Sequence, residues 1–307
     1  MNPLGIWRFL VEVVNAWLED KASRLGAALA YYSVFSLAPL LVLAVGVAGL
    51  IFDRETARHA IDTEIRATVG EPAATALDEL VKNLPSEGGS RLAAIVGLIT
   101  LIIGASGVFA ELQDALNTVW KVKPRPDRTW RDIVRERFLS FAIVLGTGFL
   151  LLISLVLTAL LSALGNWLAG ELPGGAALWH IVNALVSFGF VTVLFALIFK
   201  LMPDVQVQWH HVWLGAAVTA FLFTIGKFLI GLYLGQSGAT STFGAAASLV
   251  VILLWVYYSS QILLFGAEFT RVYARRFERV PPAENAQPVT QRERARQGMP
   301  APSSGAA

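Results

Sequence analysis

The chain has 307 residues, of which 55% are hydrophobic and 15% are charged, and its formal net charge is +2. Soluble domains carry about 25% charged residues, so this composition argues against a soluble protein. The chain contains no cysteine, which excludes disulfides, thiolate metal sites and cysteine nucleophiles.

The N-terminal segment has the pattern of an amphipathic helix lying in a membrane interface. Its apolar residues recur at helical spacing, and the polar residues fall opposite them. We therefore expect an in-plane helix over residues 4–20, within a cytoplasmic segment 1–24. Glu12, Glu19 and Asp20 argue against a cleaved signal peptide. The apolar stripe consists of Trp7, Leu10, Val11, Val14, Trp17 and Leu18.

Five long runs contain no charged residue, and each is about as long as the 20 apolar residues that cross a bilayer. These runs are 25–52, 92–110, 138–170, 172–199 and 228–267. The last is too long for one helix and must turn within a Gly, Ser and Thr cluster, GQSGATSTFG. The sequence thus predicts an all-α, polytopic membrane domain over residues 25–270. Its six expected spans are 25–52, 92–110, 138–165, 179–199, 212–235 and 243–267.

The acidic loop 53–90 shows two apolar helical patterns separated by GEP at positions 70–72. Glycine ends helices and proline opens them. We expect this loop to form a two-helix cap on the outer face of the membrane.

The distribution of basic residues predicts the orientation of the chain. With six spans, the segments 1–24, 111–137, 200–211 and 268–307 share one side of the membrane. They carry 18 Lys and Arg residues, against four in the segments of the opposite side. Because basic loops stay in the cytoplasm, both termini are expected to be cytoplasmic.

The tail 280–307 is rich in Pro, Ala, Gln and Arg. It offers few apolar groups to bury, so we expect it to be disordered in the cytoplasm.

The polar residues do not form a recognisable catalytic site. The four histidines are His59, His180, His210 and His211, and the sequence has no metal-binding histidine motif, nucleophile elbow or phosphate loop. We therefore expect no enzyme activity, no metal or other cofactor, and no nucleic-acid partner.

Two polar clusters follow predicted spans. In GASGVFAELQDALNTVWK, Glu111, Asp114 and Asn117 are spaced by three and form one helical stripe. Glu268 follows the last span, with Arg271 one turn later. Two interpretations are open for these groups: solvated helix ends with local ion pairs, or residues facing an inner vestibule that binds solute or gates its passage.

Three further candidates lie inside spans. Pro39 interrupts the first span, as in the broken helices that line transport sites, although proline kinks also occur in ordinary spans. Lys227 is charged within the fifth span, where it either snorkels to the outer surface or points inward towards the anionic part of a solute or lipid headgroup. Tyr257 is a candidate hydrogen-bond partner for Lys227. Small residues in GAAVTAF are expected to allow close helix packing.

Three segments resemble one family of membrane proteins, and the resemblance covers about residues 5–277. These segments are RLGAALAYYSVFSLAPLL, GASGVFAELQDALNTVWKV and TFGAAASLVVILLWVYYSSQILLFGAEFTRVYA. They are similar to the YihY or virulence factor BrkB family, formerly mislabelled ribonuclease BN. The resemblance implies a multi-pass protein of the bacterial inner membrane, and it implies no catalytic residues.

Two functions fit these observations. The first is a permease or exporter of a small polar or amphipathic solute or a lipid, since intramembrane polar groups accompany a proline-broken span. The second is a non-transporting protein that organises the envelope through its outer cap and its tail. The expected partners are the lipid bilayer and a small solute or lipid headgroup, and homo-oligomerisation is left open.

Overall fold

A computed structural model describes six stretches of the chain and a few single positions. The stretches are 3–34, 107–124, 175–236, 247–277, 280–283 and 286–290, with single positions 62, 66, 71, 74, 75 and 293. The labelled elements are α1 (Pro3–Glu19), β1 (Val122–Pro124), α7 (Gly175–Leu201), α8 (Trp209–Gln236), α10 (Ala247–Phe277) and β2 (Ala286–Pro288). Residues 22–34 and 107–120 are also helical. The described chain is mostly helical, which confirms the fold class at that level.

Three described helices are long and apolar enough to cross a membrane. They provide the apolar segments Ala184–Leu201, Trp209–Tyr233 and Leu249–Phe277. These correspond to the fourth, fifth and sixth expected spans. Residues 25–34 and 107–110 are the described parts of the first and second spans, and the third lies outside the described residues.

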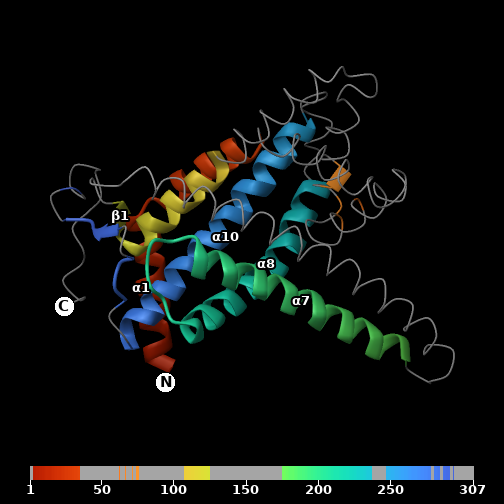
Figure 1. The fold of residues 1–307 in the computed structure, drawn as a ribbon. Helices are drawn as coiled ribbons and strands as arrows, with labels where there is room; N and C mark the ends of the chain where they lie inside the picture. The colour runs from red at the N-terminus through yellow and green to blue at the C-terminus, as the bar shows by residue number, and fades with distance from the viewer. Residues whose placement is uncertain are drawn as a thin grey trace, which may run out of the picture.

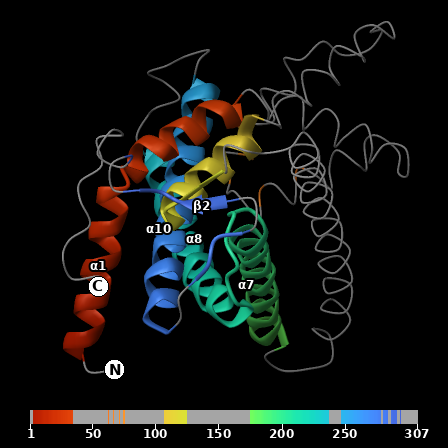
Figure 2. The same cartoon turned by 60° about the vertical axis from the view of Figure 1, so that its left-hand side comes forward.

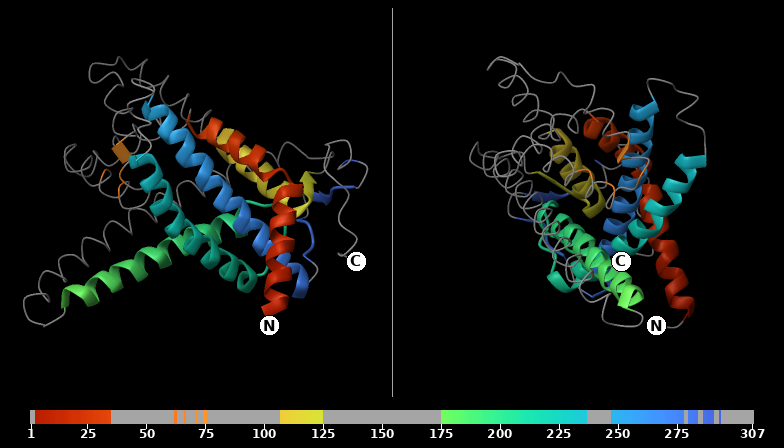
Figure 3. Two further views of the ribbon diagram at one scale, coloured as in Figure 1. Left: turned by 180° about the vertical axis from the view of Figure 1, so that it is seen from behind. Right: turned by 90° about the vertical axis from the view of Figure 1, so that its right-hand side faces the viewer.

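The long helices cross one another at different angles (Figure 1). α7 packs against α8 near its C-terminal end, and its N-terminal half extends away from α8 and α10 (Figures 1 and 3). Leu185 in that half is exposed, as are Phe221 and Phe228 on α8. Exposed apolar surface of this kind suits contact with lipid, where it needs no protein partner.

Close contact between α8 and α10 depends on glycines facing threonines. A Cβ atom built on Gly215 would lie 1.8 Å from Thr270 Oγ1, and one built on Gly266 would lie 1.9 Å from Thr219 Oγ1. Only glycine fits at these positions, because any other residue would overlap the opposing side chain. The two contacts run in opposite directions along the helices, so α8 and α10 are antiparallel. The GAAVTAF segment thus packs as its small residues predicted.

α1, Pro3–Glu19, covers the expected helix 4–20 except for Asp20, and it lies along the C-terminal part of α10. Phe9 and Val13 are buried against α10, and the Phe9 ring meets Phe269 edge to face at 4.9 Å. The predicted apolar stripe lies mostly on the exposed side, with Trp7 67% exposed. The helix ends where Lys21 adopts a left-handed conformation with φ of 52°, and the chain changes direction there (Figure 2).

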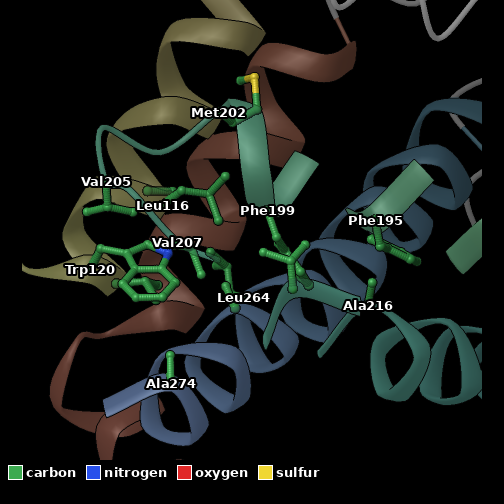
Figure 4. Close-up of a cluster of buried hydrophobic side chains, with 14 of the residues drawn as sticks. Leu116, Trp120, Phe195, Phe199, Met202, Val205, Val207, Ala216, Leu264 and Ala274 are labelled. Carbon is green, nitrogen blue, oxygen red and sulfur yellow. The ribbon is translucent and has the colours of Figure 1, made fainter. Parts of the chain in front are cut away.

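The main apolar core lies at one end of the bundle. Figure 4 shows Leu116 and Trp120 meeting Val205, Phe199 and Leu264, so three segments distant in sequence share this core. Asp20 forms an ion pair with Lys121 at this end of the bundle, and Gly107 contacts Tyr32 at the opposite end of the same two helices. The helices 22–34 and 107–120 are therefore antiparallel neighbours.

We call this end of the molecule the charged end, defined by residues 17–24, 111–124, 200–211, 268–277, 280–283, 286–290 and 293. Described parts of the four segments that the sequence assigned to one side of the membrane meet here, through hydrogen bonds such as those from Asn117 to Asp204 and from Ala283 to Asp204. The alternation of six spans itself stays a prediction, because three candidate spans lie among the described residues.

The prediction of a disordered tail was wrong for its first residues. β2 pairs with β1 in antiparallel fashion, with Gln287 opposite Lys123, and Val205 forms a bridge with Pro282. Ala286 is only 1% exposed and belongs to the core. Composition misled because this segment is held by backbone hydrogen bonds to other segments, which a count of apolar side chains does not measure.

The expected outer cap lies mainly outside the described residues. The five described positions of loop 53–90 are all helical. Arg66 bonds Asp62 at 2.7 Å, one helical turn away, and also pairs with Glu71.

Candidate functional site

Polar and charged side chains are buried together at the charged end. Asp20 and Glu268 are fully buried, and Asn117, Asp204 and Arg271 are each less than 10% exposed. We call these five residues and Lys121 the charged layer. Buried charges are unfavourable unless they are paired or hydrogen-bonded, so their partners determine what this layer does.

Asn117 binds Asp204 through both ends of its side-chain amide. Asn117 Nδ2 donates to Asp204 Oδ2 at 2.8 Å, and the backbone N–H of Asp204 donates to Asn117 Oδ1 at 2.8 Å. Gln113, one turn before Asn117, donates from Nε2 to Asp204 Oδ1 at 3.2 Å. The helix 107–120 is thereby attached to the connection between α7 and α8.

Asp20 and Lys121 form a second link. The Lys121 ammonium donates to Asp20 Oδ1, and the Asp20 side chain is fully buried. Lys121 follows the end of helix 107–120 and has a φ of 60°, as Lys21 has a left-handed φ after α1. The ion pair therefore joins two helix ends at which the chain changes direction.

Glu268 and Arg271 form a buried ion pair on α10. Arg271 Nε and Nη2 donate to Glu268 Oε2 at 2.9 and 2.7 Å. Both bonds reach the same oxygen, and Glu268 Oε1 is buried with no hydrogen-bond partner among the residues that the structure describes. This leaves a desolvated acceptor facing the bundle interior.

Gln261 lies seven residues before Glu268, on the same face of α10. Its Nε2 donates to the carbonyl oxygen of Ala22 at 3.4 Å. Its Oε1 is also buried and without a hydrogen-bond partner in the described part of the chain. One face of α10 therefore carries two buried oxygen acceptors about 10 Å apart by helix rise.

The predicted stripe on helix 107–120 divides into different environments. Asn117 is buried, Glu111 is half-buried and Asp114 is exposed. Burial raises the pKa of Glu111 above its ordinary value, and the nearby Asp114 carboxylate raises it further. Partial desolvation by the adjacent protein surface raises the pKa of Asp114. The structure therefore places Asn117 among buried partners and Asp114 at the surface.

Lys227 is half-buried on α8, seven residues after the buried Ala220 and on the same helical face. The adjacent Gly226 packs against Tyr258 and Ile262 of α10. Tyr257 is half-buried on α10. The roles predicted for Lys227 and Tyr257 stay predictions, and Pro39 lies outside the described residues.

The sequence interpretation did not select several residues of the charged layer. Asp204 lies 87 positions after Asn117, within LMPDVQV, and no local periodicity links the two. Gln113 had one usable signal, because it lies four residues before Asn117 on the same helical face. Asp20 and Lys121 gave no signal beyond their positions at helix ends. Among the described residues, no group of three or more His, Asp and Glu side chains is placed to hold a metal ion.

Comparison with known proteins gives relatives that are also membrane proteins. The chain is 28% identical over 262 residues to a UPF0761 membrane protein of Pseudomonas aeruginosa, covering 85% of this chain and 60% of that protein. It is 32% identical over 180 residues to a UPF0761 membrane protein of Tolumonas auensis, covering 57% of this chain and 56% of that one. The chain thus spans about 60% of the length of the first of these relatives. No solved structure matches the chain.

The family comparison covers most of the chain. The virulence factor BrkB family matches residues 13–291, which include the charged layer, α7, α8, α10 and the part of α1 from Val13 onward. Together with the apolar helices α7, α8 and α10, this match makes the chain a membrane protein. The chain belongs to the virulence factor BrkB family.

Proposed function

We propose that the chain is a multi-pass permease or exporter in the bacterial inner membrane, with both termini in the cytoplasm. Its substrate would be a small polar or amphipathic solute or a lipid, and it would carry out no enzymatic reaction. The observation that carries this proposal is the buried, unpartnered Oε1 of Glu268 on α10.

A buried acceptor without a hydrogen-bond partner destabilises the fold, so its presence suggests that it serves a function. A buried polar atom without a partner costs about 1–3 kcal/mol. Ionisable groups within apolar bundles commonly mark solute or ion pathways. Glu268 Oε1 and Gln261 Oε1 present two acceptors on one face, so a solute with hydrogen-bond donors, such as a hydroxyl or ammonium group, would complement them.

Reconstitution into liposomes tests the proposal. Purified protein is assayed against a panel of polyols, amines, amino acids and fluorescently labelled lipids. We expect flux of at least one compound, and we expect Glu268→Gln to reduce that flux at least tenfold because the acceptor loses its charge. Glu12→Gln is the matched control, since Glu12 pairs with Arg276 at an exposed position.

Folding must be separated from function in this comparison. Glu268→Gln leaves the buried Arg271 without its charge partner, and breaking a buried pair can cost about 3–5 kcal/mol. The double variant Glu268→Gln with Arg271→Met removes both charges and should fold better than the single variant. Loss of flux in a folded double variant supports the proposal, whereas wild-type flux in that variant contradicts it.

The alternative is a protein that organises the envelope without transporting anything. The exposed apolar side of α1, including Trp7 and Leu18, favours this function because it offers a surface for lipid or protein contact. Absence of flux for every compound, together with specific cross-links from α1 to another envelope protein in cells, would favour this alternative.

A further inference from the structure

The chain beyond α10 crosses the charged end as an extended strap. We define the C-terminal strap as residues 280–283, 286–290 and 293. It begins near the end of α10 and leads to β2, which lies beside β1 (Figure 1).

The first half of the strap is bound to the connection between α7 and α8. The backbone N–H of Gln206 donates to the carbonyl oxygen of Pro281 at 3.1 Å, and the N–H of Ala283 donates to the carbonyl oxygen of Asp204 at 2.9 Å. Asp204 is also the residue that Asn117 binds through its side chain. The strap and helix 107–120 therefore hold the same turn.

The second half of the strap is bound to the end of helix 107–120. β2 pairs with β1, and the N–H of Val289 donates to the carbonyl oxygen of Lys121 at 3.0 Å. Glu293 accepts bonds from Lys123 and from Thr290. These donors hold the pKa of Glu293 at about 2, so the ion pair persists at neutral pH.

The strap is more exposed to solvent than the charged layer beneath it. Ala286 is the fully buried side chain among the described strap residues, whereas Pro281, Pro288 and Thr290 are exposed. Backbone hydrogen bonds at an exposed edge can exchange with water when the strap lifts. The hydrogen bonds between Asn117 and Asp204 are buried, so water cannot replace them in this way.

We propose that the C-terminal strap is a releasable latch that holds the charged end closed during transport. The latch spans three segments, because it starts at α10, binds the turn after α7 and pairs with the end of helix 107–120. These segments cannot separate at the charged end until the strap lifts from Asp204 and from β1. The proposal rests on the transport function proposed above, which it extends to regulation of access from this end.

A removable cross-link tests the latch. The chain has no cysteine, so Lys123→Cys with Gln287→Cys places the only two thiols directly opposite each other across the β1–β2 ladder. Opposed residues in an antiparallel pair have Cα atoms about 4.5–5.5 Å apart, which a disulfide can span. The same protein is studied oxidised and reduced, and the single variant Lys123→Cys is the control.

Hydrogen exchange of the full chain in nanodiscs gives a readout that needs no solute. We expect the oxidised form to exchange the backbone amides of residues 107–124 and 201–212 at least tenfold more slowly than the reduced form. Where a transported compound has been found, oxidation should abolish its flux and reduction should restore it. Failure to form the disulfide, or equal exchange in both forms, would overturn the latch.

A second variant releases the strap instead of locking it. Ala286→Glu places a charge in the core and should expel β2, which would accelerate exchange in the same segments at least tenfold. Pro288→Ala, at an exposed position of the same strand, should leave exchange unchanged. If the exchange rates differ but no compound is transported, the strap acts as a latch and the permease proposal is wrong. If flux is measured and is equal in the locked and reduced forms, the permease proposal stands and the latch proposal is wrong.

Discussion

Asn117 is the predicted site residue with the most complete set of partners. Its amide donates to the Asp204 carboxylate and accepts the Asp204 backbone N–H, both at 2.8 Å. Replacing the side chain removes two bonds at once and leaves groups of Asp204 buried without those partners. Asn117 therefore contributes first to the stability of the protein.

We expect Asn117→Ala to destabilise the protein by about 2–4 kcal/mol, because each buried group that loses its partner costs about 1–3 kcal/mol. Thermal unfolding of the detergent-solubilised protein measures the effect. Asp114→Ala, at an exposed position of the same helix, is the control and should not destabilise the protein. Equal unfolding temperatures for the two variants would show that the Asn117 bonds are not important.

Glu111 gives a pH-dependent prediction. Burial and the neighbouring Asp114 raise its pKa in the folded protein, so the charged form destabilises the fold. This loss is present above the folded pKa, and it disappears as the pH falls below the unfolded value of about 4.3. Glu111→Gln should thus raise the unfolding temperature at pH 7, and the difference should vanish near pH 4.

Glu111→Gln also separates the two interpretations of this residue. A variant that is more stable at pH 7 yet has lost flux in liposomes would assign Glu111 to the transport pathway. Retained flux would leave it as a partly desolvated helix-end residue. A lower unfolding temperature at pH 7 would contradict the inferred destabilisation by the charged carboxylate.

At the scale of helices, the contacts of Gly215 and Gly266 determine how closely α8 and α10 approach. Gly266→Ala should destabilise the pair by about 1–3 kcal/mol, because overpacking forces side chains or backbone to shift. Gly231→Ala is a control on α8, where an added Cβ would meet nothing within 4 Å. Thermal unfolding in detergent compares the two variants.

A second substitution checks the cause. The predicted clash involves the side chain of Thr219, which lies 1.9 Å from the position of the added Cβ. The double variant Gly266→Ala with Thr219→Ala should recover most of the lost stability. If the double variant loses as much stability as the two single variants together, the clash with Thr219 is not the cause of the destabilisation.

Helix positions were largely predictable, and helix ends less so. The charge-free run ended the last span at 267, but α10 continues to Phe277, and Glu268 and Arg271 pair within this extension. The sequence showed this pair as one interpretation of Glu268. It did not show that only one carboxylate oxygen is paired, since that depends on three-dimensional packing around α10.

At the scale of the whole molecule, orientation in the membrane is the prediction on which the others depend. The charge bias predicts Glu71 outside the cytoplasm and Arg279 inside it. Reporter fusions after each residue test this: alkaline phosphatase should be active after Glu71 and inactive after Arg279. Phosphatase activity after Arg279 would contradict the orientation.

The arrangement of the charged end was only partly predictable. The sequence placed the segments around Lys121, Asp204 and Arg271 on one side of the membrane, and the structure brings these residues to one end of the described helices, while the number of spans stays a prediction. The contacts among them join residues as far apart as Asp204 and Ala283, and no local pattern encodes such pairs. The strap was missed for the same reason, because its stability comes from edges supplied by other parts of the chain.

The paired glycines and threonines also fix the register between α8 and α10. Thr219 faces Gly266, and moving α10 by one turn would bring Ile262 or Thr270 opposite it. Either shift places a branched side chain where the glycine now lies, so the two helices cannot slide along each other while they remain in contact. While this contact is kept, α8 and α10 therefore move together, and any rearrangement changes their contacts with α7, α1 or helix 107–120 instead.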